Sequence, residues 1–261
     1  MTRIEPTRFT LVTLNLRFGL ADDGENRWEL RKEVFPEMLG ELDPDFLCVQ
    51  EANDFQVADL AAMLPDHGYI GRRDPAPPFW QNNVIFHRNT WTYTGRDHFF
   101  LSPTPDIASR FRESRWPRQC TLGIFEKNTR RLAVADTHFD FDPEIQRLSA
   151  EIILKRMARR VPTALSTVVA GDFNANPQSP CLAAFTDPDA ENPAAGFTSA
   201  VTPPYPATSH GFTGNTDGEP IDWILYRGGI VVEKAEVITK QYRDRYPSDH
   251  FPVLARFCFS R

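Results

Sequence analysis

Cysteine, long apolar runs and basic charge are all scarce in this sequence of 261 residues. The four cysteines, Cys48, Cys120, Cys181 and Cys258, lie far apart and form no C-x-x-C pair. Three of them fall in apolar segments that resemble strands. Buried free thiols in a reducing compartment therefore fit the sequence better than disulfides or a zinc site.

No apolar run is long enough to span a bilayer. The N-terminal sequence MTRIEPTRFTLV also lacks the apolar core of a signal peptide. We therefore expect a soluble, cytoplasmic protein that does not act at a membrane.

The charge balance limits the classes of partner. Lysine and arginine number 29 and aspartate and glutamate 35, which gives a net charge of −6. This balance argues against a protein that coats nucleic acid generally. It does not exclude a nuclease, because a bound metal ion and a few arginines can offset the charge locally. With 41% hydrophobic residues, the chain can bury a large core.

Apolar periodicity predicts strands and helices that mix along the chain without strict alternation. Strands are predicted at 9–16, 46–50, 84–87, 91–101, 120–125, 132–137, 167–170, 221–226, 230–239 and 253–259, and helices at 27–42, 54–64 and 144–160. Segments 84–87 and 91–101 are predicted to pair across a turn, and 187–219 to form a long surface loop. This mixture predicts an α/β fold with two packed, mostly antiparallel sheets and helices outside, which is a four-layer sandwich. No linker divides residues 1–261, so we expect a single domain.

Polar residues follow two of the predicted buried strands. Asn15 ends the first strand, and Glu51 follows Phe46-Leu47-Cys48-Val49-Gln50. A carboxylate at the end of an apolar strand is costly to bury unless it is paired or bound to a metal. A turn is the alternative explanation for Asn15, and a helix N-terminus is the alternative for Glu51.

Three further polar residues follow two later strands. His138 ends the strand at 132–137, where a structural hydrogen bond is the more common role for a lone histidine. Asp172 and Asn174 are two residues apart in Gly171-Asp172-Phe173-Asn174, so in extended backbone both point to the same side. Together they can hold a water and a phosphate oxygen. The alternative is an Asx-type turn.

The last group of polar residues lies near the C-terminus. Asp222 is surrounded by apolar strand residues and therefore needs a partner, which we expect to be a histidine or an arginine. Asp249 and His250 lie at a predicted turn, where the carboxylate can bind a metal and the imidazole can transfer a proton.

In this order, these residues resemble the endonuclease/exonuclease/phosphatase superfamily over nearly the whole chain. The most specific motifs are GDFN at 171–174 and SDHFPV at 248–253, supported by LNLR at 14–17 and QE at 50–51. The resemblance implies Mg²⁺ or Mn²⁺ as cofactor. It also implies Glu51 as the metal carboxylate, with Asn15 beside it and Asp249 as a second carboxylate near the metal. Oxygen ligands around a hard cation suit phosphate-ester hydrolysis, which needs charge neutralisation.

The resemblance also implies a set of catalytic residues. Asp172 corresponds to the base that activates water, and Asn174 to a phosphate ligand. His138 and His250 correspond to imidazoles that flank the phosphate, and Asp222 to a carboxylate that orients a catalytic histidine.

A narrower resemblance connects the chain to a bacterial subgroup with poorly defined substrates. It rests on Phe99-Phe100-Leu101-Ser102-Pro103-Thr104-Pro105 followed by Trp116 and Arg118, and on Thr208-Ser209-His210-Gly211-Phe212. We therefore assign Arg118 and His210 to substrate binding. Arg118 is the best placed of four arginines in the segment 102–118, since it enters a strand; a solvated loop is the alternative for the group. The chain departs from the subgroup at 72–83, where the usual Gly-Glu is missing and Phe79 and Trp80 are expected to form an aromatic lip instead.

The sequence thus predicts a metal-dependent phosphoric ester hydrolase that acts as a phosphodiesterase or phosphatase. A DNA or RNA nuclease of the same superfamily is the first alternative, and an inactive binding module with the same fold is the second. Intact Glu51, Asp172 and His250 argue against the inactive module. The expected partner is a phosphate ester, nucleic acid included. We infer no protein partner and expect a monomer.

Overall fold

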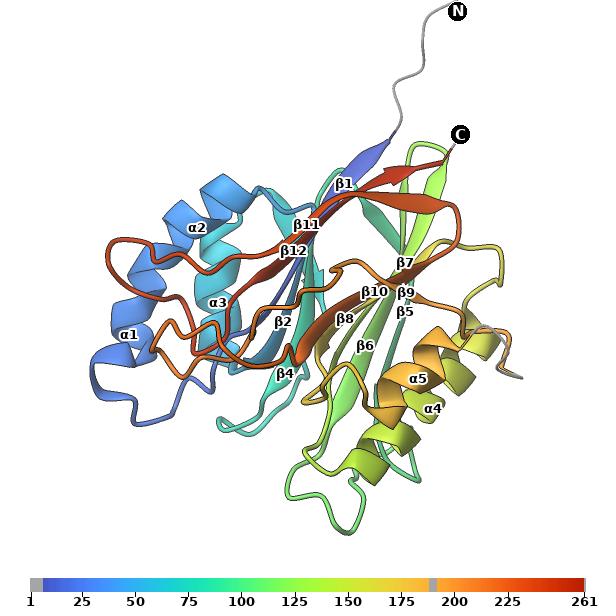
Figure 1. The fold of residues 1–261 in the computed structure, drawn as a ribbon, viewed down its shortest axis with the longest axis horizontal. Coiled ribbons are helices and arrows are strands. Elements are labelled where there is room, and N and C mark those ends of the chain that lie inside the picture. Colours follow the sequence, from blue (N-terminus) through green and yellow to red (C-terminus); the bar gives the residue numbers. More distant parts are fainter. Residues whose placement is uncertain (1–6, 188–191, 261) are drawn as a thin grey trace, which may run out of the picture.

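The computed structural model describes residues 7–187 and 192–260, and these form two packed six-stranded sheets with helices on their outer faces (Figure 1). The first sheet contains β1 (Arg8–Asn15), β2 (Phe46–Ala52), β3 (His67–Ile70), β4 (Asn82–Arg88), β11 (Ile230–Val237) and β12 (Val253–Phe259). The second contains β5 (Thr92–Phe100), β6 (Gln119–Lys127), β7 (Arg130–His138), β8 (Thr167–Asp172), β9 (Thr198–Ser199) and β10 (Asp222–Arg227).

The strand orders are β11-β12-β1-β2-β4-β3 and β5-β6-β7-β8-β10-β9. Each sheet has one parallel pair, β1 with β2 and β7 with β8, and its other pairs are antiparallel. The helices α1 (Trp28–Arg31), α2 (Phe35–Leu42) and α3 (Asp54–Met63) cover the first sheet, and α4 (Pro143–Arg160) and α5 (Pro180–Thr186) cover the second (Figure 1). The predicted four-layer sandwich is confirmed.

Central strands are buried on both faces, which explains why they are apolar at nearly every position. In β1, Val12 and Leu14 pack against the helices, whereas Leu11 belongs to the core between the sheets. In β2, Leu47 faces the helices and Cys48 faces the other sheet. Alternate side chains of a strand point to opposite faces, so each sheet contributes to two cores.

The helix predicted at 27–42 is interrupted. The structure has α1, a 3₁₀ turn at Lys32–Val34, and then α2, whose first turn contains Pro36. Proline has no backbone N–H to donate to the preceding turn, and its ring clashes with the carbonyl four residues earlier. Pro36 therefore starts a new helix in place of continuing the old one.

The predicted pairing of segments 84–87 and 91–101 is wrong. Strand β4 lies in the first sheet between β2 and β3, and β5 is at the edge of the second sheet beside β6. Between them, Trp91 is fully buried in the core between the sheets, with ring centroids 5.2 Å from Phe46 and 5.9 Å from Phe9. The connection therefore crosses from one sheet to the other, anchored by this tryptophan.

Three short elements escaped prediction, namely β3, α5 and β9. The last of these lies within the predicted loop at 187–219, of which residues 188–191 are outside the described part. The four cysteines are buried and free, as predicted. Within the described ranges, no helix has the length and apolar character needed to cross a membrane.

Candidate active site

Three predicted catalytic residues lie side by side on adjacent strands of the second sheet. In the sheet register, His138 at the end of β7 pairs with Asp172 at the end of β8, and Asp172 pairs with Asp222 at the start of β10. All three side chains are buried. Directly opposed residues on neighbouring strands share a face of the sheet, so the register itself brings this row together.

Gly171 allows the close strand approach that forms this row. Its φ is +144°, and a Cβ atom there would lie 1.9 Å from the carbonyl oxygen of Thr137 on β7. Only glycine fits such a contact. The glycine of the GDFN motif is therefore required by backbone packing directly beside Asp172.

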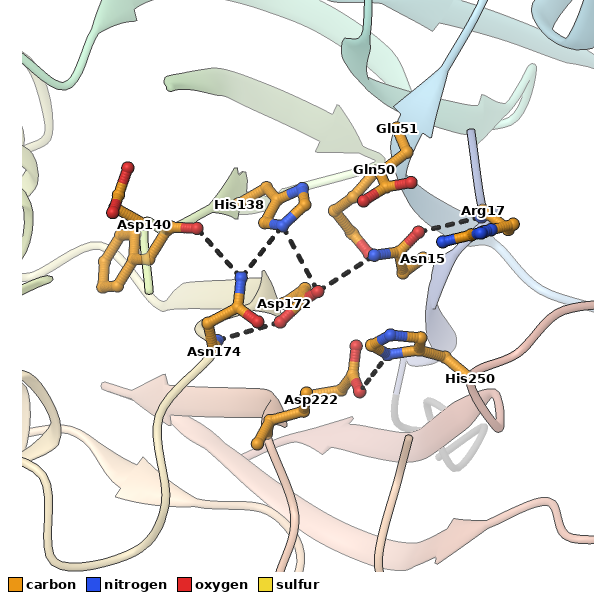
Figure 2. Close-up of polar contacts among 12 residues, drawn as sticks. Asn15, Arg17, Gln50, Glu51, His138, Asp140, Asp172, Asn174, Asp222 and His250 are labelled. Atoms are coloured by element: carbon orange, nitrogen blue, oxygen red, sulfur yellow. Dashed lines mark hydrogen bonds and ion pairs between the residues drawn. The ribbon is translucent and has the colours of Figure 1, made fainter. Parts of the chain in front are cut away.

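The first sheet completes the site from the opposite side. Asn15, at the end of β1, donates from Nδ2 to Asp172 Oδ2 at 2.9 Å, which links the two sheets across the site (Figure 2). Its Oδ1 accepts from the backbone N–H of Arg17 at 2.8 Å. Glu51 has a left-handed φ of 59°, and its Oε2 accepts from the backbone N–H of Phe18 at 2.7 Å. The predicted metal residues Asn15 and Glu51 therefore lie at the ends of two adjacent strands, β1 and β2.

Asn174 differs from the extended arrangement considered in the sequence. Its φ is 48°, and its backbone N–H donates to Asp172 Oδ1 at 2.9 Å, so the GDFN segment forms an Asx-type turn. Its Nδ2 lies 3.0 Å from the carbonyl oxygen of Phe139 and 3.1 Å from His138 Nε2. Both amide hydrogens are thus occupied, and Asn174 orients His138 where a phosphate contact was predicted.

Asp172 is held in an environment that favours its protonated form. Burial, followed by the neighbouring charge of Asp222, raises the pKa of Asp172 to about 7, although His250 and hydrogen bonds from Asn15 and Asn174 oppose the rise. A carboxylate that titrates near neutral pH can accept a proton from a reacting group and release it again.

His250 is held in the opposite state. Burial alone would lower its pKa, but the charge of Asp222 and a 2.8 Å bond between His250 Nδ1 and Asp222 Oδ2, helped by Asp172 and Asp249, outweigh burial and raise the pKa to about 10. His250 is therefore cationic at neutral pH and can donate from Nε2. Asp222 thus has the histidine partner that its buried context requires.

His138 is neutral, because burial and the positive charges of Arg118 and His250 lower its pKa well below the usual value. Its Nε2 lies 3.4 Å from Asp172 Oδ2. With Asn174 donating to the same nitrogen, Nε2 is the acceptor of the ring and its single lone pair is occupied. The neutral histidine therefore places no positive charge beside Asp172.

Two groups of residues could hold a cation. Asp172, Asp222 and His250 have ligand atoms within 4.8 Å of one another, but His250 is protonated and bonded to Asp222, which leaves it without a lone pair for a metal. Glu51 fits better: within the described residues only Oε2 has a hydrogen-bond donor, and Oε1 is left for a ligand. Oxygen donors with room for water suit Mg²⁺ or Mn²⁺.

The third predicted metal residue, Asp249, lies beside Arg17. Its Oδ2 is 3.6 Å from Arg17 Nη1, and its Oδ1 accepts from Ser248 Oγ at 3.1 Å. The Arg17 guanidinium is also bonded to Asp23 and feels the charges of Asp249 and Glu51, so its pKa is raised. Asp249 thus adds negative charge near Glu51, with a guanidinium between them.

The sequence predicts Arg118 at the rim of the substrate site, but in the structure its side chain is buried below the surface. It is only 6% exposed, and its Nε has no hydrogen-bond partner in the described part of the chain. Burial lowers its pKa, whereas Asp172, Glu51 and Asp140 oppose that change. Its side chain lines a cavity of about 450 Å³ together with Glu51 and Arg17. A buried guanidinium with an unused donor beside the catalytic carboxylates is suited to binding an anion.

The other arginines of the 102–118 segment do not join Arg118. Arg110 donates to backbone carbonyls of its own loop, including those of Phe111 and Arg112, and Arg115 lies over the ring of Trp116. Arg118 is therefore the arginine of this segment that lines the cavity, whereas Arg110 and Arg115 contact their own loop.

His210 does not line this cavity. Its ring stacks on Phe251 with centroids 3.8 Å apart, and its Nδ1 accepts from the backbone N–H of Gly214 at 3.2 Å. Its own backbone N–H donates to the carbonyl of Asp249. Burial lowers its pKa to about 4, so the ring is neutral. The structure thus places His210 behind the Asp249-His250 turn, where it supports the turn, and not at the predicted substrate contact.

Sequence reasoning gave no role to several supporting residues. Arg31 is 1% exposed and donates to the backbone carbonyls of Arg17 and Pro247, which ties both site loops together. Thr208 Oγ1 accepts from the backbone N–H groups of Ile221 and Asp222. The segment containing Thr208 was noticed by resemblance, whereas Arg31 sits in a helix where a charged residue normally indicates a solvent-facing position.

These features define a hydrolase-type site for phosphate esters on a two-sheet α/β sandwich. The model of the endonuclease/exonuclease/phosphatase family matches residues 12–250, and the chain belongs to this family. Members of this family are hydrolases that act on phosphate esters and generally use divalent metal ions. No curated protein matches the sequence.

Solved structures show the same architecture over the whole length. A family protein from Bacteroides thetaiotaomicron is 27% identical, with a TM-score of 0.88 over 98% of this chain and 100% of that one. A mannosyl-6-phosphatase from the same organism is 25% identical, with a TM-score of 0.86 over 96% of this chain and 100% of that one. D. rerio TDP2, complexed with a single-strand DNA product, shares the fold at 12% identity, with a TM-score of 0.73 over 96% and 99% of the two chains.

Proposed function

We propose that this protein is a Mg²⁺- or Mn²⁺-dependent hydrolase of small phosphate esters. The observation that carries the proposal is the buried pair of Asp172, with a pKa of about 7, and cationic His250, beside Arg118, whose Nε has no hydrogen-bond partner among the described residues. The pair supplies a base and an acid whose environments push their pKa values apart, which is how acid–base roles are divided at neutral pH. The likeness to a mannosyl-6-phosphatase adds support for phosphatase chemistry.

In this proposal Asp172 accepts the proton of the attacking water. Asn15 and the backbone N–H of Asn174 hold its two oxygens, which fixes the direction of the carboxylate. His138 stays neutral and, held by Asn174, keeps its place beside Asp172. His250 donates from Nε2 to a phosphoryl oxygen as negative charge develops there, and Asp222 keeps it protonated and oriented.

Arg118 holds the phosphate in the cavity through its free donors. Glu51 would hold the divalent cation through its free oxygen, with Asn15 and Asp249 at its sides. When bound, such a cation neutralises phosphate charge and favours in-line displacement. In this proposal a base, a cationic acid and an anion site therefore act on the same phosphate.

Metal removal and one isosteric change test this function. EDTA is expected to abolish hydrolysis of a phosphomonoester, and Mg²⁺ or Mn²⁺ to restore it. Glu51→Gln is expected to raise the metal concentration needed for half-maximal rate. Undiminished hydrolysis in EDTA would contradict the metal role of Glu51.

Asp172→Asn keeps the shape of the side chain and removes its charge. We expect kcat to fall roughly 10²- to 10⁴-fold, the usual contribution of general acid–base catalysis. The exposed Asp66→Asn serves as the matched control and should keep wild-type turnover. A near wild-type kcat for Asp172→Asn would rule out Asp172 as the base.

The two alternative functions have their own outcomes. Rapid nicking of plasmid DNA by the wild type would favour a nuclease, and no hydrolysis of any ester would favour an inactive module.

A further inference from the structure

The cavity beside Glu51 and Arg118 has walls that are mostly aromatic. Its volume is about 450 Å³, within the range of small-molecule sites. The lining residues are Phe18, Phe79, Trp80, Trp116, Pro117, Phe141, Gln81, Arg17, Glu51 and Arg118. Three of the rings are unusually exposed: 63% for Phe79, 47% for Trp116 and 72% for Phe141. Large apolar side chains gathered at one opening indicate a binding surface.

Contacts behind these rings hold several of them in place. Arg73 lies 4.2 Å from the centroid of Trp80, and Arg115 lies 4.9 Å from that of Trp116. Asn53 Nδ2 donates to the carbonyl oxygen of Trp80 at 3.0 Å, which fastens the 78–80 segment close to Glu51. Rings fixed before binding lose little conformational freedom when a ligand arrives.

Charge and apolar surface are separated within the cavity. Arg118 is buried, has an unpartnered Nε, and also lies 5.7 Å from the centroid of Phe141. The anion site is therefore continuous with the aromatic wall. A ligand with a phosphate at one end and a flat apolar group at the other matches this arrangement.

Few polar groups remain for a ligand with many hydroxyls. Arg17 is bonded to Asp23, and Arg118 and Glu51 serve the phosphate end, so the Gln81 amide and the indole N–H groups of Trp80 and Trp116 are the polar side-chain groups left in the wall. A sugar would bury hydroxyls without partners, which costs free energy for each one. A flat aromatic ring has no such cost and stacks on the exposed side chains.

We propose that this cavity selects phosphate esters whose alcohol part carries a flat aromatic ring, which stacks between Phe79, Trp116 and Phe141. The inference rests on the proposed function and names its substrate class. The ring could belong to an aryl group or to a nucleobase, and the two sources share the same recognition by stacking.

Matched esters test the selectivity. The wild type is expected to hydrolyse benzyl phosphate or a nucleoside 5′-monophosphate with a higher kcat/KM than methyl phosphate or mannose 6-phosphate, whose alcohols are comparable leaving groups, and the better of the first two identifies the source of the ring. Trp116→Ala and Phe79→Ala should each lower the ratio of aromatic to methyl kcat/KM by about 3- to 10-fold. Tyr93→Ala is the matched control, since Tyr93 is 46% exposed but lies outside the cavity, and it should keep the wild-type ratio.

A binding measurement separates this inference from the catalytic proposal. Calorimetry with benzylphosphonate and methylphosphonate requires no turnover, and the benzyl compound should bind more tightly to wild type but lose that advantage in Trp116→Ala. Equal binding of the two phosphonates, or a better rate with mannose 6-phosphate, would overturn the aromatic selectivity while leaving the hydrolase standing. Tighter benzyl binding without hydrolysis of any ester would sink the catalytic proposal and keep the aromatic site.

Discussion

Asp172 and His250 show how neighbouring side chains set opposite protonation states. Both are buried, and burial favours the neutral form of each. The negative charge of Asp222 adds to the effect of burial at Asp172, where it disfavours ionisation, and opposes burial at His250, where it favours protonation. One carboxylate therefore tunes both the base and the acid.

The pH dependence of kcat/KM follows from this arrangement. The rate should rise as Asp172 loses its proton near pH 7 and fall as His250 loses its proton near pH 10. Asp222→Asn removes the charge that raises both values, so both limbs should move to lower pH, the alkaline limb by roughly 1 to 3 units. Asp66→Asn should leave both limbs in place. An unmoved alkaline limb in Asp222→Asn would show that His250 is not the group titrating there.

Individual site residues were predictable when their chemistry conflicted with their surroundings. Glu51, Asp172 and Asp222 are acidic residues next to apolar strands, and this conflict is visible in the sequence. Arg31 shows no such conflict, because an arginine in an amphipathic helix normally faces water. Its burial against carbonyls of distant loops is a tertiary feature that local pattern cannot reveal.

At the scale of elements, long apolar strands were predictable and their partners were not. The segments that became β1, β2, β7 and β8 carry continuous apolar runs, as strands buried on two faces must. The false pairing of β4 with β5 arose because the short connection resembles a hairpin, whereas the burial of Trp91 directs the chain between sheets. Short elements such as β9 lack enough residues to show a period.

The close contact between β7 and β8 gives a prediction about stability. Gly171→Ala would place a methyl group against the carbonyl of Thr137, in a backbone conformation that also disfavours alanine. We expect a loss of about 3 to 5 kcal/mol in the free energy of unfolding, measured by urea denaturation. Gly196→Ala is the control: its φ is +81° but nothing lies within 4 Å of the added carbon, so the loss should be about 1 to 2 kcal/mol. Equal losses would contradict the packing argument.

The whole molecule contains a polar cluster between its two sheets. Asp136 is fully buried and accepts from Gln50 Nε2 at 2.6 Å. Burial raises its pKa well above the usual value, although bonds from Gln50 and Asn83 oppose the rise. The folded state therefore binds a proton at Asp136 that the unfolded state releases near pH 4.

The difference in bound protons between the folded and unfolded states determines the direction in which stability changes with pH. From about pH 4 up to the raised pKa, the folded protein holds more protons, so Asp136 makes stability fall as pH rises. Asp136→Asn removes the effect, and its free energy of unfolding relative to wild type should improve by about 1.4 kcal/mol for each pH unit in that window. Denaturation at several pH values measures the trend. A constant difference between the two proteins would mean that Asp136 is already ionised in the fold.

The net charge of −6 bears on how strongly the binding of duplex DNA to the whole protein depends on salt. Among the described residues that line the cavity, the arginines are Arg118 and Arg17, so few phosphates of a duplex would be neutralised. Each neutralised phosphate steepens the salt dependence of binding by about 0.9 in log–log slope, and we expect a slope no steeper than about −3. Fluorescence anisotropy with labelled duplex DNA at increasing salt measures it, with a short single strand for comparison. A slope of about −6 or steeper would reveal an extended phosphate-binding face and favour the nuclease, because the substrate would then contact far more of the surface than the single cavity.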